Sequence, residues 1–259
     1  MDSASPTSPQ DSAGSSFVKR LFERAPAEDL ARYDAATLDA AAAFATRALQ
    51  QHRREQSVVA IDVLAMPDNR TPLTAITVVN DNMPFLFDSV VGEVAAETGE
   101  AVLVVHPIFD VRHDAEGAFA AILADEEAET EADRVSVIQI HTTQLSSADG
   151  ELLKQRVLSV LRQVQAAVTG WRPMLARLDQ AIAGFRNAPA QLAKPAVDEA
   201  VAFLEWLRDE NFTFLGMRDF LYQGDAVEGG LERVETPGLG ILSDPDVRVL
   251  RRGSEPVVT

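Results

Sequence analysis

The pattern of apolar and polar positions is clearest between Leu73 and Gly99. Leu73 to Val79 is rich in β-branched residues, which predicts a strand. A helix should follow, because apolar residues then recur every three or four positions, at Leu86, Val90, Val91 and Val94. Gly99 is placed to end this helix, since glycine readily adopts the left-handed conformation found after helices. The stretch therefore predicts a strand, a tight polar turn and a helix.

Other strand-like segments lie on both sides of this stretch. Ser57 to Met66 predicts a preceding strand, and Ala101 to Arg112 predicts one long following strand with Ala118 to Ala124 as its hairpin partner. Val135 to Thr143 is largely apolar on both faces and is expected inside the sheet. These segments together predict an α+β domain.

The rest of the chain is mainly helical. Phe17 to Arg24 predicts a short helix, and the alanine-rich stretch from Pro26 to Glu55 predicts one or two more. Three helices are expected later, at Ser147–Thr169, Arg172–Phe185 and Pro195–Asp209, with Pro173 and Pro195 in early turns. A new β region is predicted at Phe212–Tyr222, Gly230–Val234 and Gly240–Leu242.

These elements divide the chain into five expected parts. Residues 1–16, rich in Ser, Pro, Asp and Gly, form a disordered tail, and residues 17–55 form a helical arm. An α+β domain spans 56–146, a helical connector spans 147–210, and a second β-rich domain starts at 211 and runs to 259. Because so short a second domain would bury little core, we expect it to be truncated and the native chain to continue.

Charge and composition exclude several classes of function. The formal net charge is −17, which disfavours nucleic-acid binding and docking on anionic membranes. No apolar run approaches the roughly 18 residues of a membrane span, and the N-terminus lacks signal-peptide features. The absence of cysteine fits a cytoplasmic protein and excludes disulfides and thiolate sites. The acidic run from Asp125 to Asp133 is expected to be a solvated loop.

The turn between the strand and the helix is the best candidate site. The five residues expected to contact a small ligand there are Asn80, Asp81, Asn82, Met83 and Phe85. Free N–H groups at the helix start favour a carboxylate, and the Asn and Asp side chains add donors and acceptors for an amino acid. The alternative is that Asp81 or Asn82 only caps the helix, with Pro84 in its first turn and no ligand.

No other motif indicates chemistry. The four histidines, His52, His106, His113 and His141, lack metal-ligand spacing, and His106 and His113 should lie on opposite faces of one strand. Nucleophile-elbow and phosphate-loop motifs are absent, so no catalytic residue, metal or cofactor is expected in this chain. The aromatic residues Trp206, Phe212, Phe214 and Phe220 are expected in the core.

Several separated motifs give the chain a family resemblance. The segments VVNDNMPFLFDSV and VLVVHPIFDVRHD resemble the N-terminal part of the large bacterial NAD-specific glutamate dehydrogenases. Two later segments, AVAFLEWLRDENFTFLGMRDF and PGLGIL, agree with that family, so the resemblance spans roughly Leu73 to Leu242.

The resemblance implies a fold and a role. It implies an ACT-like (ferredoxin-like βαββαβ) domain, a helical connector and the start of a second ACT-like domain. In such domains an amino-acid effector lies near the first strand-to-helix turn, which here is Asn80 to Phe85. Many of these domains have a glycine in this turn, where the present chain has Met83-Pro84-Phe85.

By the same resemblance, the parent enzyme would convert L-glutamate to 2-oxoglutarate with NAD, while this chain regulates and assembles it. The implied partners are a second copy, through an exposed apolar face of the first ACT-like domain, the C-terminal catalytic portion and a small amino acid. Two alternatives stay open: a free-standing amino-acid sensor and a purely structural oligomerisation module.

Overall fold

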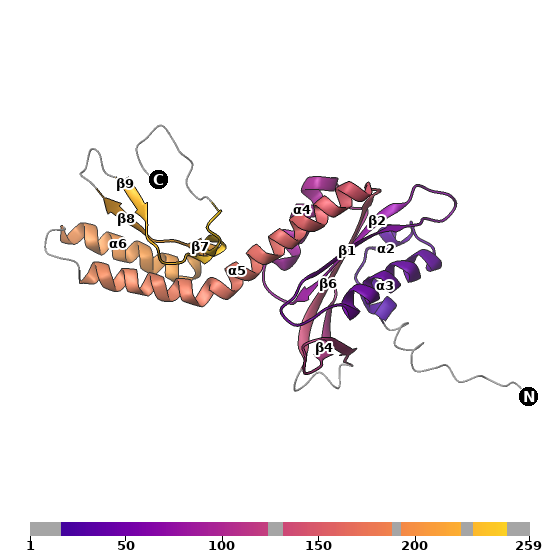
Figure 1. Ribbon diagram of the computed structural model, residues 1–259, viewed down its shortest axis with the longest axis horizontal. Helices are drawn as coiled ribbons and strands as arrows, with labels where there is room; N and C mark the ends of the chain where they lie inside the picture. The colour runs from indigo at the N-terminus through magenta and orange to yellow at the C-terminus, as the bar shows by residue number, and fades with distance from the viewer. Residues whose placement is uncertain (1–16, 124–131, 188–192, 224–229, 248–259) are drawn as a thin grey trace, which may run out of the picture. The chain divides into compact units, whose positions relative to one another are not determined.

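The computed structural model describes residues 17–123, 132–187, 193–223 and 230–247 (Figure 1). The predicted tail (1–16) and the acidic residues from Asp125 to Glu131 lie outside the described residues. The chain forms two compact units, Met1–Leu161 and Arg162–Thr259, which are described separately.

In the described residues of the first unit, an antiparallel sheet of six strands forms the centre. Its strands are β1 (Val58–Leu64), β2 (Leu73–Asp81), β3 (Leu103–Val105), β4 (Ile108–His113), β5 (Phe119–Ile122) and β6 (Asp133–Thr143). Their order is β1-β2-β6-β4-β5, with β3 also paired to β6. The central position of β6 confirms the sequence prediction, and eight successive residues of this strand are buried.

Helices cover both faces of this sheet (Figure 1). Residues 17–22 and α3 (Ala35–Gln50) are helical and pack on one face, after the short helix α2 (Ala27–Leu30). The other face is covered by α4 (Leu86–Thr98) and the first part of α5 (Ser147–Arg186). Successive side chains of β2 point to opposite faces of the sheet and so contribute to both cores: Val79 faces α3, whereas Val78 faces α4.

The long strand predicted from Ala101 to Arg112 is interrupted at Pro107, so that prediction was wrong in this detail. Proline lacks the N–H group that a ladder hydrogen bond needs. The Pro107 carbonyl still accepts the Val137 N–H at 3.0 Å. The register against β6 is preserved across the break, because Val105 lies opposite Gln139 and Ile108 opposite Ser136.

The element order agrees with most of an ACT-like unit. From β2 onward the order is a strand (β2), a helix (α4), the interrupted strand β3–β4, a further strand (β6) and a second helix (α5), with β5 as an addition. Among the described residues, no strand after α5 joins this sheet, and β1 occupies the edge beside β2. The first unit is thus a mixed α/β domain with an antiparallel sheet, consistent with an ACT-like domain.

The described part of the second unit contains the remainder of α5, helix α6 (Lys194–Trp206) and two small two-stranded sheets. The sheets pair β7 (Gly216–Met217) with β10 (Leu239–Gly240) and β8 (Phe220–Gln223) with β9 (Gly230–Arg233). A wide turn, Leu207–Asn211, follows α6.

Two helices were predicted where α5 runs as one, because Pro173 lies inside it rather than in a first turn. The apolar stripe explains this continuity, since Met174, Leu178 and Ile182 continue it as buried residues beyond the proline. Pro195 does lie in the first turn of α6, as predicted.

Candidate functional site

The turn between β2 and α4 is tied into the first unit by its polar side chains. Ser57 Oγ donates to Asn80 Oδ1 at 2.5 Å, and Asn80 Nδ2 donates to the Asp81 carbonyl at 2.8 Å. Asp81 Oδ2 accepts the Glu55 N–H at 2.6 Å. Asn82 Oδ1 accepts from Ser136 Oγ at 3.0 Å, which links the turn to β6. Protein groups therefore already bind these three predicted site residues.

The helix cap proposed for Asp81 or Asn82 is absent. Strand β2 extends to Asp81, and α4 begins only at Leu86, so Pro84 precedes the helix instead of lying in its first turn. Phe85 occupies the N-cap position without a side-chain hydrogen bond to the helix. The carboxylate and amide oxygens are instead bound to Glu55 and Ser136, which the sequence places far away.

The apolar residues of the turn differ in their surroundings. Met83 is half-buried against the core beneath α4, whereas Phe85 is 50% exposed. Phe85 has φ 66° and ψ −6°, the left-handed conformation that glycine favours. An aromatic residue in this conformation is strained, and such strain concentrates at ligand clamps and switches.

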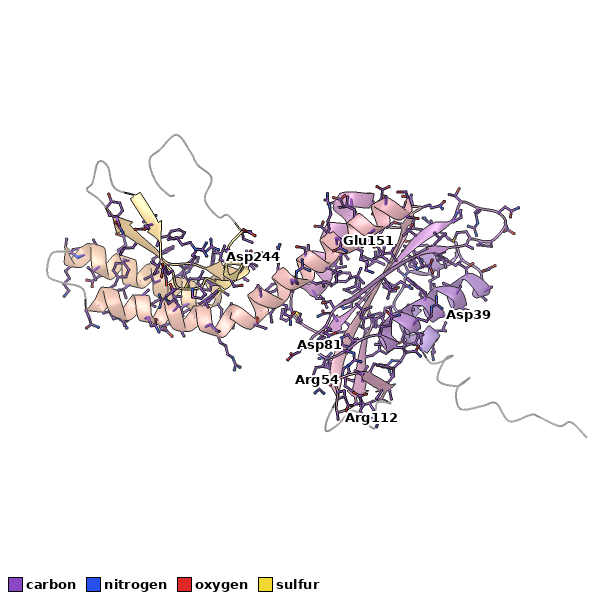
Figure 2. The ribbon with its side chains drawn as sticks, viewed as in Figure 1. Asp39, Arg54, Asp81, Arg112, Glu151 and Asp244 are labelled. Carbon is purple, nitrogen blue, oxygen red and sulfur yellow. The ribbon has the colours of Figure 1, made fainter. Side chains whose placement is uncertain are left out.

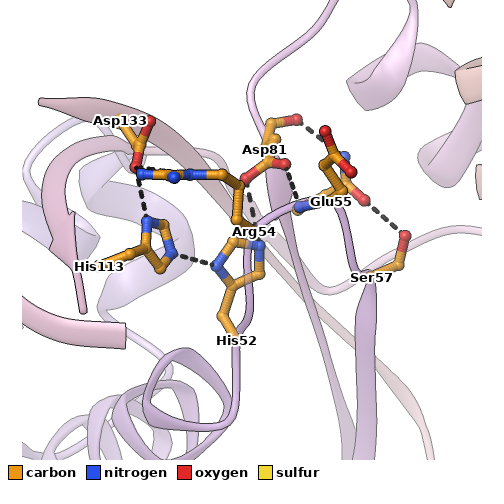
Figure 3. Close-up of polar contacts among 8 residues, drawn as sticks. His52, Arg54, Glu55, Ser57, Asp81, His113 and Asp133 are labelled. Atoms are coloured by element: carbon orange, nitrogen blue, oxygen red, sulfur yellow. Dashed lines mark hydrogen bonds and ion pairs between the residues drawn. The ribbon is translucent and has the colours of Figure 1, made fainter. Parts of the chain in front are cut away.

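A chain of two histidines and two carboxylates begins at the same turn (Figure 3). His52 Nε2 lies 3.5 Å from Asp81 Oδ1, and His52 Nδ1 lies 3.1 Å from His113 Nε2. His113 Nδ1 lies 2.8 Å from Asp133 Oδ2, which also accepts from Arg54 at 2.6 Å. Figure 2 places Arg54 and Asp81 in the context of the first unit.

The hydrogen positions in this chain follow from the carboxylate at its end. An ionised Asp133 accepts only, so His113 Nδ1 donates to it and a neutral His113 Nε2 accepts from His52 Nδ1. A neutral His52 then has no hydrogen on Nε2, which leaves that nitrogen and Asp81 Oδ1 both without a hydrogen-bond partner among the described residues. A single proton on His52 Nε2 would satisfy both atoms.

The electrostatic environment differs between the two ends. Burial lowers the pKa of His52, and the nearby Asp81 carboxylate opposes this shift. Partial burial alone would raise the pKa of Asp133, but hydrogen bonds from Arg54 and His113 hold it below its ordinary value. The chain therefore combines an ionised carboxylate at one end with an unsatisfied acceptor pair at the other.

This arrangement was not predicted from the sequence. Asp133, expected in a solvated acidic loop, is the first residue of β6 and is paired with Arg54 and His113. His52 and His113 are 61 residues apart, so no local motif signals their contact. His106 lies in the interruption between β3 and β4, where it contacts Ser136 and stacks on Phe87, so the prediction that it shares one strand with His113 was wrong.

Among the residues that the structure describes, no cluster of three or more potential metal ligands occurs. No helix in the described ranges is long and apolar enough to span a bilayer.

Comparisons with known proteins add to this geometry. A family model described as "Glutamate dehydrogenase, ACT1 domain" matches residues 17–157. An NAD-specific glutamate dehydrogenase from Halomonas elongata is 34% identical over 172 residues, which cover 65% of this chain and 11% of that protein. A protein of the same name from Pseudomonas aeruginosa is 26% identical over 244 residues, covering 92% of this chain and 14% of that protein. The aligned regions thus span only a small part of these relatives.

Proposed function

Because the chain belongs to the glutamate dehydrogenase family that contains the ACT1 domain, as part of its N-terminal region, we propose that it regulates and helps to assemble an NAD-specific enzyme. The complete enzyme would oxidatively deaminate L-glutamate to 2-oxoglutarate with NAD, in the cytoplasm. The segment described here would hold no catalytic residue and no cofactor. Residues 56–146 would form the first ACT-like domain, and a second would begin near residue 211.

We propose that an amino-acid effector binds at the turn formed by Asn80, Asp81, Asn82, Met83 and Phe85. The observation that carries this proposal is the strained and half-exposed Phe85 at the start of α4. Hydrogen bonds hold the preceding residues, so a change at Phe85 would be transmitted to α4 or, through Asn82 and Ser136, to the centre of the sheet.

An activity ratio in the complete enzyme tests this proposal. The rate of glutamate-dependent NAD reduction is measured with and without each amino acid at millimolar concentration. At least one amino acid should change the rate, and the change should be reduced in Asn82→Ala. The control Asn187→Ala, which removes an exposed asparagine of the second unit, should respond like the wild type. A full response in Asn82→Ala, or none in the wild type, would contradict effector binding at the turn.

The second unit is the better candidate for an assembly surface. Seven of the ten exposed large apolar side chains among the described residues belong to it. Trp206 and Phe212, expected in the core, are 51% and 52% exposed. The first unit exposes only Val63, Phe85 and Leu152 in this class, counted over its described part, so the predicted apolar pairing face has little support there. We propose that the remainder of the enzyme covers these exposed apolar side chains of the second unit, since the relatives are much longer than this chain.

Oxidative footprinting read by mass spectrometry distinguishes this occupant from solvent, because it reports Trp206 separately from every other tryptophan. Trp206 should be oxidised more slowly in the complete enzyme than in the 259-residue chain. Equal oxidation in both would contradict the assignment, and sedimentation of the short chain would reveal self-pairing instead.

A further inference from the structure

A cleft in the first unit carries more positive charge than its surroundings. Its volume is about 320 Å³, at the lower end of the range for ligand pockets. It lies between the helix at residues 17–22 and the interruption of the strand at Pro107. The charged and polar residues that line it are Arg20, Glu23, Arg24, His106 and Arg134.

The three arginines of this cleft have no ion pair among the described residues, and in this they resemble Arg32, Arg47, Arg53, Arg70 and Arg112 of the same unit. Elsewhere in the first unit, Arg54 is paired with Asp133 and Arg156 with Glu97. None of the cleft arginines has an ion pair among the described residues, although acidic residues outnumber basic ones, 40 to 23. Three like charges around one cleft repel each other unless an anion lies between them.

One of these arginines is held in place by the core. The Arg20 guanidinium carbon lies 4.7 Å from the centroid of the Phe109 ring, and Phe109 is fully buried. Such a cation–π contact orients the guanidinium at the sheet. The cleft therefore contains one guanidinium that is fixed against the core, whereas Arg24 and Arg134 are exposed.

The cleft is connected to the β2–α4 turn. His106 Nε2 lies 3.1 Å from Ser136 Oγ, whose hydrogen is donated to Asn82 Oδ1, so the Ser136 oxygen accepts from His106. The Asn82 N–H also donates to the Arg134 carbonyl at 2.8 Å. A ligand that moves Arg134 or His106 would thus act directly on Asn82.

We propose that this cleft binds a small divalent oxyanion, a dicarboxylate or phosphate. Three arginines against the single Glu23 leave two positive charges without compensation when His106 is neutral. Guanidinium groups match carboxylate and phosphate oxygens in bidentate geometry. The site itself is independent of the proposed function, and only the choice of 2-oxoglutarate as the first probe rests on it.

Calorimetric titration of the 259-residue chain tests the cleft directly. The probes are 2-oxoglutarate, inorganic phosphate and, as a molecule without net charge, L-glutamine. One of the two divalent anions should bind saturably with a stoichiometry of one, and L-glutamine should not. Comparison of the two anions identifies the preferred oxyanion.

Variants locate the binding. Arg24→Gln and Arg134→Gln should each raise the dissociation constant of the anion by at least about tenfold, because each removes a charge-assisted hydrogen bond. Arg24→Lys should weaken anion binding less, since the charge remains while the bidentate geometry is lost. The matched control is Arg112→Gln, an exposed arginine of β4 outside the cleft (Figure 2), and it should bind like the wild type.

Two results would overturn the proposal. One is the absence of saturable binding of both anions at millimolar concentration to a wild-type chain that melts cooperatively. The other is equal weakening in Arg112→Gln and the cleft variants, which would indicate a general charge effect. The titration reports binding alone, so its result and that of the activity assay are distinguishable: an anion that binds in the cleft without changing the turnover of the complete enzyme would refute regulation and leave the cleft site intact.

Discussion

At the scale of single residues, Asp81 shows how a side chain acquires a role through distant partners. Its sequence position suggested a helix cap, but its carboxylate accepts the Glu55 N–H and faces His52 Nε2. We expect Asp81→Ala to lower the free energy of unfolding by about 1 kcal/mol, because the Glu55 N–H loses its acceptor.

The isosteric change gives the opposite expectation. Asp81→Asn keeps an oxygen for the Glu55 N–H and offers an N–H donor to His52 Nε2, so stability at neutral pH should stay within about 0.5 kcal/mol of the wild type. The control Asp39→Ala, an exposed residue of α3 (Figure 2), should be near neutral. Urea unfolding measures all three, and equal losses in both Asp81 variants would refute the hydrogen-bond argument.

His141 gives the chain a pH dependence. The residue is fully buried in β6, its Nδ1 lies 2.9 Å from the Tyr33 hydroxyl, and burial lowers the pKa of His141 to about 4. Burial likewise raises the pKa of Tyr33 to about 12. The unfolded chain binds the histidine proton near pH 6.5, the ordinary value, whereas the folded chain does not until about pH 4.

The contribution of His141 to the free energy of unfolding should therefore be fully present above about pH 6.5. It should be lost as the pH is lowered toward about 4, a loss of about 3 kcal/mol. His52 and His106, whose pKa values are also lowered, add to the same slope. Urea unfolding across this range measures it, and His141→Gln should flatten the slope because the replacement does not titrate. An unchanged slope in that variant would show that other groups cause the dependence.

At the scale of elements, the start of α4 depends on the backbone of Phe85. In an ordinary helix alanine is more stable than glycine by about 1 kcal/mol. At Phe85 the order should reverse, because left-handed backbone destabilises any residue with a Cβ by about 1–2 kcal/mol. Thermal unfolding of Phe85→Gly and Phe85→Ala tests this, with the same pair of substitutions at Glu93 inside α4 as the control. A more stable alanine at both positions would contradict the strained conformation.

Helix α5 tests whether packing overrides a local signal. A proline inside a helix is destabilising by about 3 kcal/mol relative to alanine, whereas a proline in the first turn is tolerated. If Pro173 lies inside one continuous helix, Pro173→Ala should raise the unfolding free energy of the second unit by up to about that amount. Pro195→Ala, in the first turn of α6, should be close to neutral. A neutral Pro173→Ala would instead favour the two helices predicted from the sequence.

At the scale of the whole molecule, the net charge of −17 opposes compactness. Added sodium chloride should raise the melting temperature, because the Debye length shrinks from about 10 Å at 0.1 M to about 3 Å at 1 M salt. Differential scanning calorimetry measures the effect. The cleft anion should raise the melting temperature further than sodium chloride at equal ionic strength, and Arg134→Gln should remove only that additional increase.

Local pattern was sufficient for most elements of the chain. The positions of β2, α4, β5, β6 and α6 could be predicted because alternation and helical spacing are properties of neighbouring residues. Gly99 ends α4 as expected, for a reason contained in the residue itself. The family resemblance likewise rests on short segments such as VVNDNMPFLFDSV, and it is confirmed by the match to residues 17–157.

Contacts between distant segments were decided only by the tertiary structure. Pairing of β6 with β2 and β4 brings Asp133, Ser136 and His113 beside residues that are 20 to 79 positions away in the sequence. Pairing of β1 with β2 brings the Glu55 N–H to Asp81 in place of the expected cap, and pairing of β4 with β6 places Arg134 near His106 at the cleft that Arg20 also lines. A sequence pattern records which face a residue belongs to, but hydrogen bonds and uncompensated charges depend on which strands become neighbours, and that is fixed by the packing of the whole sheet.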